Sequence, residues 1–575
     1  MKDRWITDWE PSVRFPHYTR ANSGEVLPEP ASPLGWSYAW EHGICLGWRD
    51  GYVRVGAYDR AEFDPVHPDV CGSFGGYMYI NLSTVRMQAV RSPVLTVEQL
   101  DMAFFGNHPD VPRYVPKDGD DRPDLVPGIE RHMGWVLTAD EWPELLADRD
   151  EIDRLRAARP DLTALDAATL LARAREIQPR LVYLFDQHTV TSSSSGIAPG
   201  VLFAIGEVIG DPSMAMRVLA ALGDVDSAEP SYALWDLSRH IGRSGELTAA
   251  FDQGVDGLLG RLEAADTQEA RAFGESWREF IARFGARGPN EWDMRSDTWE
   301  TRPEIALAAL DRVRFQRDDE SPRARSREHA RDREKLTAEV RDRLADQPEL
   351  LGQFEAALHA ANMMAWRERT KTNIVKALHE ARMVFRELGR REAQSGHLIE
   401  RGHIFMLLDD ELEAFIADPG LFRDELAARA ADYLELFELE PPFIIADGAV
   451  KPLGEWPRRG SAPPLVASSG TVLQGVPGGP GSASGRARVV LDPSDPGALE
   501  PGDILVAPLT DPAWTPLFMA AGGVVVDVGG QISHAIIVCR ELGLPCAVSV
   551  TDATRRVPDG AMITVDGDTG TVTVH

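Results

Sequence analysis

The sequence predicts an α+β multidomain protein, with a large, mostly helical N-terminal domain containing short strands, followed by a small β-rich domain with one helix. Residues 139–440 are rich in Ala, Leu, Glu and Arg, with apolar residues every three or four positions, which is typical of helices. Residues 471–575 instead hold short β-branched runs separated by turn residues. A chain of 575 residues is too long for one hydrophobic core, so two or three domains are expected.

Residues 1–127 are rich in Gly, Pro and Trp, and the alternating run GYMYINLS at 76–83 is typical of a strand. The region is therefore predicted to consist of loops and strands. The helical region after it is illustrated by Leu351, Phe354 and Leu358, which fall on one stripe of a helix.

Residues 441–470 hold six prolines and show little periodicity, which indicates a linker. Twenty extended residues at about 3.1 Å each would reach roughly 60 Å. The predicted domains are thus 1–440, a linker at 441–470, and 471–575. Within the last domain, strands are expected in GRARVVL, DILVAPL, GGVVVDVGG, PCAVSV and AMITVDGDTGTVTV, and a helix in HAIIVCREL.

The formal net charge of -30 argues against a nucleic-acid partner, because the acidic chain repels polyphosphate backbones. The four cysteines have no CxxC spacing, so a reducing compartment is expected and no metal site is predicted. The N-terminus lacks the apolar stretch of a secretory signal, and nowhere do 18 uncharged apolar residues run together. We expect a cytoplasmic protein without a membrane partner.

One segment of the small domain points to chemistry. An apolar strand leads into Gly529 and Gly530, then Ser533, and then His534 at the start of a helix that stops at Gly543. This order places an imidazole beside the free N–H groups of a helix N-terminus, which bind anions. Neutral histidine is also a nucleophile, so His534 could carry a phosphate. A structural histidine at a helix start would give the same spacing.

GGQISHAIIVCRELGLPCAVSV resembles the phosphohistidine signature of phosphoenolpyruvate-utilising enzymes, and DILVAPLTDPAWTPLF resembles the stretch that leads into the histidine loop of rifampin phosphotransferases. The resemblance implies a β/β/α phosphohistidine swivelling domain at 471–575. It implies that His534 is the phosphoryl carrier and that Gly529, Gly530 and Ser533 bind phosphate.

The large domain resembles the antibiotic-binding domain of rifampin phosphotransferases in three short segments: TRANSGEVLPEPASPLGWS, RFGARGPNEWDM and WRERTKTNIVKAL. Ala286 stands where the family has histidine in the second segment. In the third, Arg367 and Lys371 lie four residues apart on one helix face, where two cations could clamp a phosphoryl group. A solvated basic face is the plain alternative.

Three further residues are candidates for the acceptor side of the site: Glu291, Arg287 and Asp511. A helix-cap or salt-bridge role is the alternative to an acceptor-side role for Glu291. His188, before a run of four serines, could belong to a polar pocket or simply precede a loop. Aromatic residues near the N-terminus could wall a pocket for a flat acceptor or form core; they are Trp5, Trp9, Trp36, Trp40, Trp48, Tyr77 and Tyr79.

The family resemblance implies a phosphotransferase subunit that passes phosphate from His534 to a hydroxyl group of a small aromatic or apolar acceptor. No ATP-grasp pattern or P-loop is visible in the chain, so ATP and Mg²⁺ are expected on a separate ATP-grasp protein, with no permanently bound cofactor here. Two alternatives stay open: a non-catalytic phosphocarrier or regulatory module that docks a protein partner, and dehydration chemistry in which phosphorylation activates a hydroxyl for loss.

Overall fold

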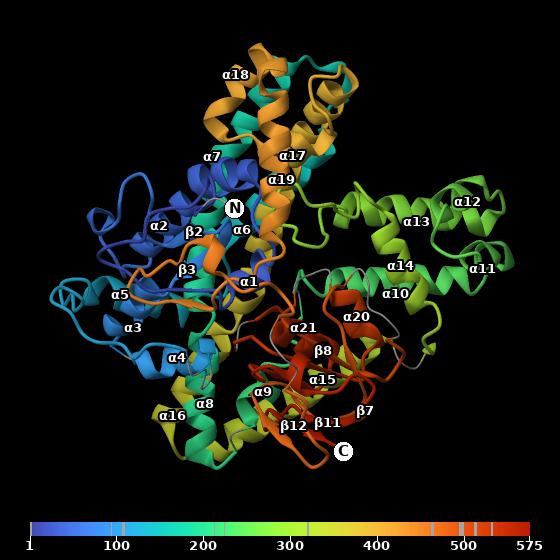
Figure 1. Cartoon of the computed structure of the whole chain (residues 1–575). Coiled ribbons are helices and arrows are strands. Elements are labelled where there is room, and N and C mark those ends of the chain that lie inside the picture. The colour runs from blue at the N-terminus through green and yellow to red at the C-terminus, as the bar shows by residue number, and fades with distance from the viewer. Residues whose placement is uncertain are drawn as a thin grey trace.

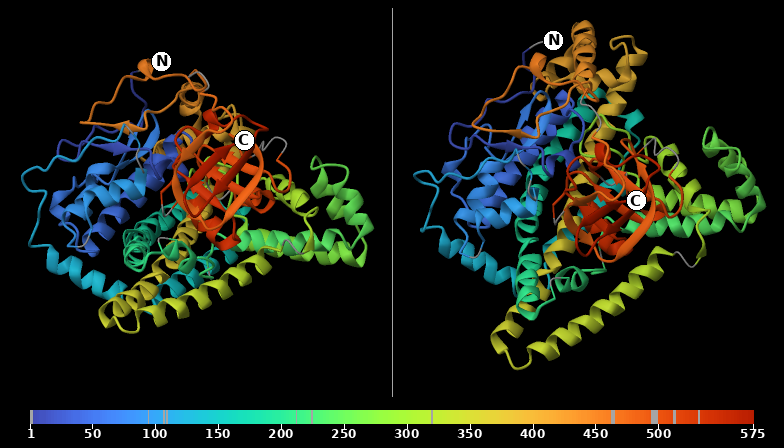
Figure 2. Two further views of the ribbon diagram at one scale, coloured as in Figure 1. Left: turned by 90° about the horizontal axis from the view of Figure 1, so that it is seen from below. Right: turned by 60° about the horizontal axis from the view of Figure 1, so that its bottom comes forward.

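The computed structural model describes residues 3–575 except 94, 106–107, 109, 212, 224, 319–320, 462–464, 494–498, 511–513 and 531–532. A large helical domain precedes a small β-rich domain, which confirms the predicted fold class. Figure 2 shows the small domain, in orange and red, between the blue N-terminal elements and the green helices of residues 229–313.

The helices of the large domain are α1 (Ser23–Val26), the π-helix η1 (Gly35–Ile44), α2 (Cys45–Arg54), α3 (Leu82–Val90), α4 (Val97–Phe105), α5 (Val126–Val136), α6 (Pro143–Ala157), α7 (Ala167–Ser194), α8 (Ile197–Ile209), α9 (Met214–Val218), α10 (Glu229–Ile241), α11 (Gly245–Phe251), α12 (Leu258–Ala264), α13 (Gln268–Phe284), α14 (Glu304–Val313), α15 (Pro322–Leu344), α16 (Pro348–Ala360), α17 (Asn362–Gln394), α18 (Leu412–Ala417) and α19 (Arg423–Leu436).

Much of the region predicted as loops and strands is helical, from η1 through α4. The prediction of loops and strands is wrong there because it treats glycine as a turn signal. On η1 and α2, Gly43, Gly47 and Gly51 recur every four residues and face α7; a Cβ at Gly47 would lie 2.1 Å from the carbonyl oxygen of Val182. These glycines permit close helix packing, and burial outweighs their low helix propensity. In the sequence they look like turn signals.

Helices α7 and α17 pack along each other and form the centre of the large domain. The stretch Ala167–Ile209, which contains α7 and α8, is long and apolar enough by length and composition to cross a membrane. Within it, α7 is packed against both α2 and α17, as expected for a core helix.

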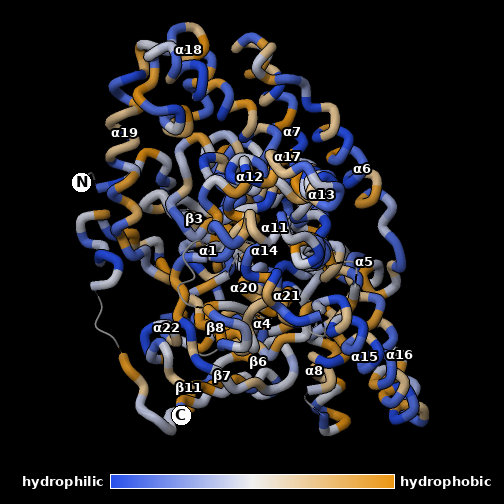
Figure 3. Tube along the Cα trace, turned by 90° about the vertical axis from the view of Figure 1, so that its right-hand side faces the viewer, coloured by the Kyte–Doolittle hydropathy of each residue, from blue (hydrophilic) through white to orange (hydrophobic). Residues whose placement is uncertain are grey.

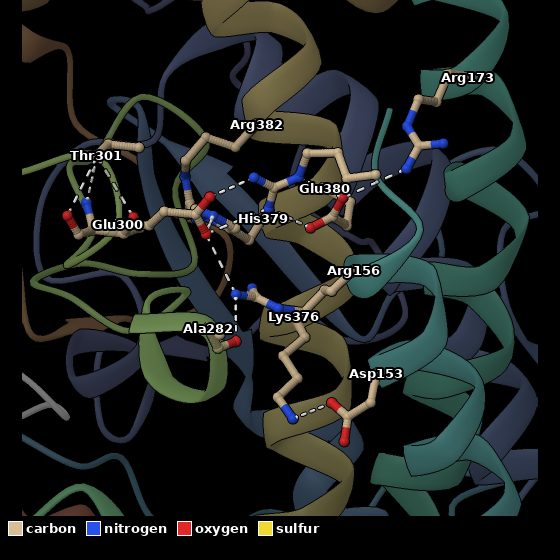
Figure 4. A network of polar contacts seen from close by, with 12 residues as sticks. Asp153, Arg156, Arg173, Ala282, Glu300, Thr301, Lys376, His379, Glu380 and Arg382 are labelled. Carbon is tan, nitrogen blue, oxygen red and sulfur yellow. Dashed lines mark hydrogen bonds and ion pairs between the residues drawn. The ribbon is translucent and has the colours of Figure 1, made fainter. Parts of the chain in front are cut away.

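The buried face of α17 carries a charged network (Figure 4). Glu380, fully buried, accepts two hydrogen bonds from Arg159, at 2.6 and 2.9 Å, and lies 3.5 Å from Arg173. His379 Nε2 lies 2.9 Å from a Glu300 oxygen, and burial lowers the pKa of His379 to about 3. The network joins α17 to α6, α7 and the loop before α14, and so fixes the helix that bears Arg367 and Lys371.

We expect Glu380→Gln to lower the free energy of unfolding by about 1.5–3 kcal/mol, because Arg159 and Arg173 would lose their buried carboxylate partner. Urea denaturation measures the change. Glu355→Gln is the control, since its exposed pair with Arg341 should contribute at most about 1 kcal/mol. Equal losses for the two variants would contradict the prediction.

The large domain also contains a four-stranded sheet in the order β2-β3-β1-β4, formed by β1 (Tyr18–Thr19), β2 (Cys71–Phe74), β3 (Tyr77–Asn81) and β4 (Ile444–Ile445). Strand β4 lies within the segment predicted as a linker, and Trp456 is buried in the core of the large domain. At the other end, Leu465 N–H donates to Arg555 O of the small domain. Contacts with the large domain thus continue to Arg459, whose N–H donates to Glu438 O, so most of the segment predicted as a linker belongs to the large domain.

The small domain is built on an eight-stranded sheet in the order β5-β12-β11-β7-β8-β9-β10-β6, with β7 to β10 parallel. Its helix α21 coincides with the predicted HAIIVCREL. The elements are β5 (Val472–Gln474), β6 (Val476–Gly479), β7 (Ser482–Val489), β8 (Ile504–Ala507), α20 (Thr515–Ala520), β9 (Gly523–Val526), α21 (His534–Leu542), β10 (Cys546–Val548), α22 (Ala553–Arg556), β11 (Met562–Asp566) and β12 (Thr571–Val574).

The two domains share a hydrophobic core. Figure 3 shows α20 of the small domain next to α14 of the large domain, with which it is in contact. Phe518 and Ile536 belong to the same buried cluster as Trp235, Leu307 and Leu310 of the large domain. The small domain is thus held against the large domain in this structure.

Candidate functional site

His534 is the first residue of α21 and follows the strand β9 and its glycine turn. Its side chain is only 5% exposed, yet its neighbours are polar rather than apolar. The hydroxyl of Thr510 lies 3.2 Å from Nδ1, and the hydroxyl of Thr515 lies 3.2 Å from Nε2. These two threonines orient the ring within the small domain.

Three cations of the large domain act on this imidazole through their charge: Lys371, Arg287 and Arg367. Burial lowers the pKa of His534 well below its usual value, and the positive charges of Lys371, Arg287 and Arg367 lower it further. The docked ring is therefore neutral, so that one ring nitrogen is an N–H donor and the other carries a lone pair. Cations that disfavour an imidazolium favour a phosphoryl group at the same position.

The three cations are held differently. Arg287 donates to Glu291 and to Thr372, each at 2.7 Å, and Arg367 donates to Glu368 at 2.7 Å. The ammonium of Lys371 makes no hydrogen bond or ion pair in the part of the chain that the structure describes. Within the described chain, the donors of Lys371 and the Nε–H of Arg367 are thus free for an incoming anion.

Glu25 is a site residue that sequence reasoning missed. It comes from α1, lies inside the segment TRANSGEVLPEPASPLGWS, and accepts the backbone N–H of His534 at 3.2 Å. Burial raises the pKa of Glu25 to about 7, although the His534 N–H and the charges of Arg367 and Lys371 act against the rise. A carboxylate that titrates near neutral pH beside a nucleophile is suited to general acid–base work.

The predicted phosphate-binding residues Gly529, Gly530 and Ser533 lie in the turn before α21. Ser533 precedes α21, and its buried hydroxyl has no partner among the described residues, so it can accept or donate a bond to a phosphoryl oxygen. A Cβ at Gly529 would lie 3.1 Å from that hydroxyl, which explains the glycine there. Gly530 accepts a bond from Ser533 N at 3.0 Å. Asp511 lies outside the described residues.

Glu291 and His188 are both buried in the large domain. One oxygen of Glu291 binds Arg287, as the salt-bridge alternative predicts, and the other has no partner within the described chain. His188 lies within α7 rather than before a loop, and its Nδ1 is 3.0 Å from the hydroxyl of Thr370 on α17. This places His188 beside the helix turn that bears Arg367 and Lys371.

A cavity of about 580 Å³ is lined by residues of α2, α5 and the start of α6, and by Val190 of α7. Trp135, Trp142 and His132 are among its lining residues, and Arg54 stacks over Trp142 at 5.3 Å. Trp142 also packs against Trp366, the residue before Arg367. The N-terminal aromatic residues predicted as pocket candidates do not line this cavity; all but the half-buried Trp48 are buried core residues.

Two parts of the chain match known families. Residues 188–368 match the rifampicin phosphotransferase fourth domain, and residues 499–570 match the mobile domain of PEP-utilising enzymes. The second match contains His534.

Whole proteins that are similar to this chain include rifampicin phosphotransferases. The chain is 26% identical to the prodigiosin synthesizing transferase PigC of Serratia marcescens, over 97% of this chain and 63% of that protein. It is 27% identical to the rifampicin phosphotransferase of Streptomyces sviceus, over 91% of this chain and 62% of the relative. A rifampicin phosphotransferase of Bacillus subtilis is 28% identical over 52% of this chain and 34% of its own length. The chain thus spans less than two thirds of each of these relatives.

Proposed function

Because the chain belongs to the rifampicin phosphotransferase-like family of PEP-utilising enzymes, we propose that it carries a phosphoryl group on His534 and transfers it to a hydroxyl group of a small molecule. The observation that carries this proposal is the meeting of His534 with Arg287, Arg367, Lys371 and Glu25 across the domain interface. Nucleophile, cations and a base are the components that phosphoryl transfer needs.

The transfer step balances with these groups alone. The P–N bond of phosphorylated His534 breaks as the bond between phosphorus and the acceptor oxygen forms, and the electron pair returns to the ring. The acceptor hydroxyl loses its proton to Glu25. Arg367 and Lys371 stabilise the negative charge on the transferred oxygens, and the Thr510 and Thr515 hydroxyls hold the departing imidazole.

The acceptor is proposed to bind the cavity that is lined by α2, α5, the start of α6 and Val190 of α7. Its two indole rings suit a flat or apolar body, and its volume of about 580 Å³ suits a small molecule. Rifampicin, which the relatives' names identify with phosphotransfer, is a suitable first probe.

We further propose that a separate cytoplasmic ATP-grasp protein, with ATP and Mg²⁺, charges His534. In the docked arrangement the large domain covers the ring, which is 5% exposed, so a donor could reach it only after the small domain moves away.

Single-turnover transfer tests the cation clamp. The chain is first phosphorylated with phosphoramidate, a small phosphoryl donor, and is then mixed with rifampicin while the loss of phosphohistidine is followed by intact mass. We expect Arg367→Ala and Lys371→Ala each to slow transfer by about 10²–10³-fold, the usual cost of removing one donor that stabilises transition-state charge. Charging of His534 should be unchanged.

Arg390→Ala is the matched control, because Arg390 lies on the same helix, is partly exposed and pairs with Glu387. Wild-type transfer rates in both site variants would contradict the clamp. If rifampicin accepts no phosphate from the wild type, the same assay is repeated with other hydroxylated aromatic compounds.

A second reaction is proposed as the alternative to transfer. In it, the acceptor hydroxyl, once phosphorylated, leaves as phosphate while a proton is lost from the neighbouring carbon. Mass spectrometry separates the two outcomes, since transfer yields a phosphate ester and elimination yields inorganic phosphate with a dehydrated compound.

A further inference from the structure

The domains meet at a second point, at the end of α21 opposite His534. Seven residues of helix separate the two points, which corresponds to roughly 10 Å. There Glu541, only 3% exposed, accepts the backbone N–H of Leu222 at 3.0 Å and of Gly223 at 3.4 Å. Both donors belong to the loop after α9 in the large domain.

The loop is shaped to present these amides. Ala221 has a positive φ of 46° and Gly223 a φ of 76°, and a non-glycine residue in the left-handed region carries a conformational cost. Arg333 of α15 donates to the carbonyl oxygens of Ala220 and Ala221. With the carbonyls held by α15, the following N–H groups point toward Glu541 and form a concave anion-binding site.

The Glu541 carboxylate has no hydrogen-bond partner within its own domain among the residues that the structure describes. Its neighbour Arg540 differs, since it donates to Gly478 O of the small domain at 3.2 Å as well as to Met216 Sδ at 3.0 Å. A buried carboxylate whose hydrogen bonds all cross an interface stabilises the docked arrangement rather than the fold of one domain.

The surroundings of Glu541 complete the contact. A Cβ at Gly543, the residue that ends α21, would lie 2.3 Å from His329 Nε2 on α15, so a side chain there would require the His329 ring to move. Gln316 of the large domain also donates to Met519 O on α20. The contact at Glu541 is therefore specific in shape and in polarity.

We propose that Glu541 is a positioning residue: by binding the Leu222 and Gly223 amides, it holds the small domain in the orientation that presents His534 to Arg367 and Lys371. The catalytic meaning of this docked state rests on the proposed function. The docking contact itself does not, because it involves neither phosphate nor acceptor.

Hydrogen–deuterium exchange of the full-length protein tests the contact directly. In Glu541→Ala we expect the amides of 219–223 and of the start of α21 to exchange about 10–100-fold faster, the change that corresponds to losing hydrogen bonds to a buried charge. Glu541→Gln keeps one acceptor oxygen, so its exchange rates at these amides should lie between those of the wild type and those of Glu541→Ala. The control Glu500→Ala removes an exposed carboxylate of the same domain that pairs with Arg486, and should leave exchange unchanged.

Arg333→Ala repeats the test from the other side, because it releases the loop without altering the small domain. Faster exchange in Arg333→Ala both at 219–223 and at the start of α21 supports the proposal. Two results in Glu541→Ala would overturn the proposal. One is unchanged exchange at 219–223 and at the start of α21. The other is exchange that rises evenly across 471–575, which would indicate that Glu541 contributes to the folding of the small domain.

In the phosphoramidate assay, Glu541→Ala should slow transfer from His534 by about tenfold or more, while charging stays equal or becomes faster because the ring is more often uncovered. A variant that loses charging and transfer equally would contradict positioning. If wild-type His534 accepts no phosphate at all, the proposed function fails, and the exchange measurements still decide whether Glu541 holds the domains together.

Discussion

Replacement of His534 by alanine is expected to abolish phosphorylation of the chain. The imidazole is the proposed point of attachment, and none of the groups around it, whether hydroxyl, guanidinium, ammonium or carboxylate, is a comparable carrier of a labile phosphoryl group. Wild-type protein treated with phosphoramidate should gain one acid-labile phosphate by intact mass, and the variant none. Transfer to an acceptor should fall to background, a loss of more than about 10⁴-fold.

His575→Ala is the control for this experiment, because His575 is an exposed histidine of the same small domain. It should be labelled like the wild type. Full labelling of the His534→Ala protein would refute the central claim. We also expect ATP with Mg²⁺ alone to leave the chain unlabelled, and a separate ATP-grasp partner to restore labelling at His534.

The second large effect is expected at Glu25. Burial raises its pKa to about 7, and as a base it must be ionised to take the acceptor proton. The transfer rate should therefore rise with pH between about 6 and 8, with an inflection near 7. Glu25→Gln keeps the shape but cannot accept a proton, so it should slow transfer by about 10²–10⁴-fold and remove the inflection.

Glu29→Gln provides the comparison, since Glu29 follows on the same segment and pairs with the partly exposed Arg295. Its pH profile should match that of the wild type. An unchanged inflection in Glu25→Gln, even with a slower rate, would assign the titration to another group and leave Glu25 a structural partner of the His534 amide.

Sequence reasoning was most accurate where structure depends on neighbouring residues. The strands around β7 to β12, the helix α21 with its stop at Gly543, and the position of His534 after a glycine turn all follow from local periodicity and turn chemistry. The helical character of α16 and α17 was predicted for the same reason.

It was least accurate where residues act through distant contacts. The glycines of α2 look like breakers in the sequence, and only their contact with α7 shows that they allow helices to pack. Residues after 440 look like a free linker because their prolines and glycines are visible, whereas the pairing of β4 with β1 is not.

By itself, then, the sequence determined the architecture of the small domain, the histidine that it presents, and the helix pair Arg367 and Lys371. Only the tertiary structure decided that these groups meet, that Glu25 joins them from 509 residues away, and that Glu541 binds a loop of the other domain. The physical reason is that periodicity and turn propensity arise from short-range sterics and hydrogen bonding. The charge, burial and proton affinity of a site arise instead from whichever distant side chains packing brings beside it.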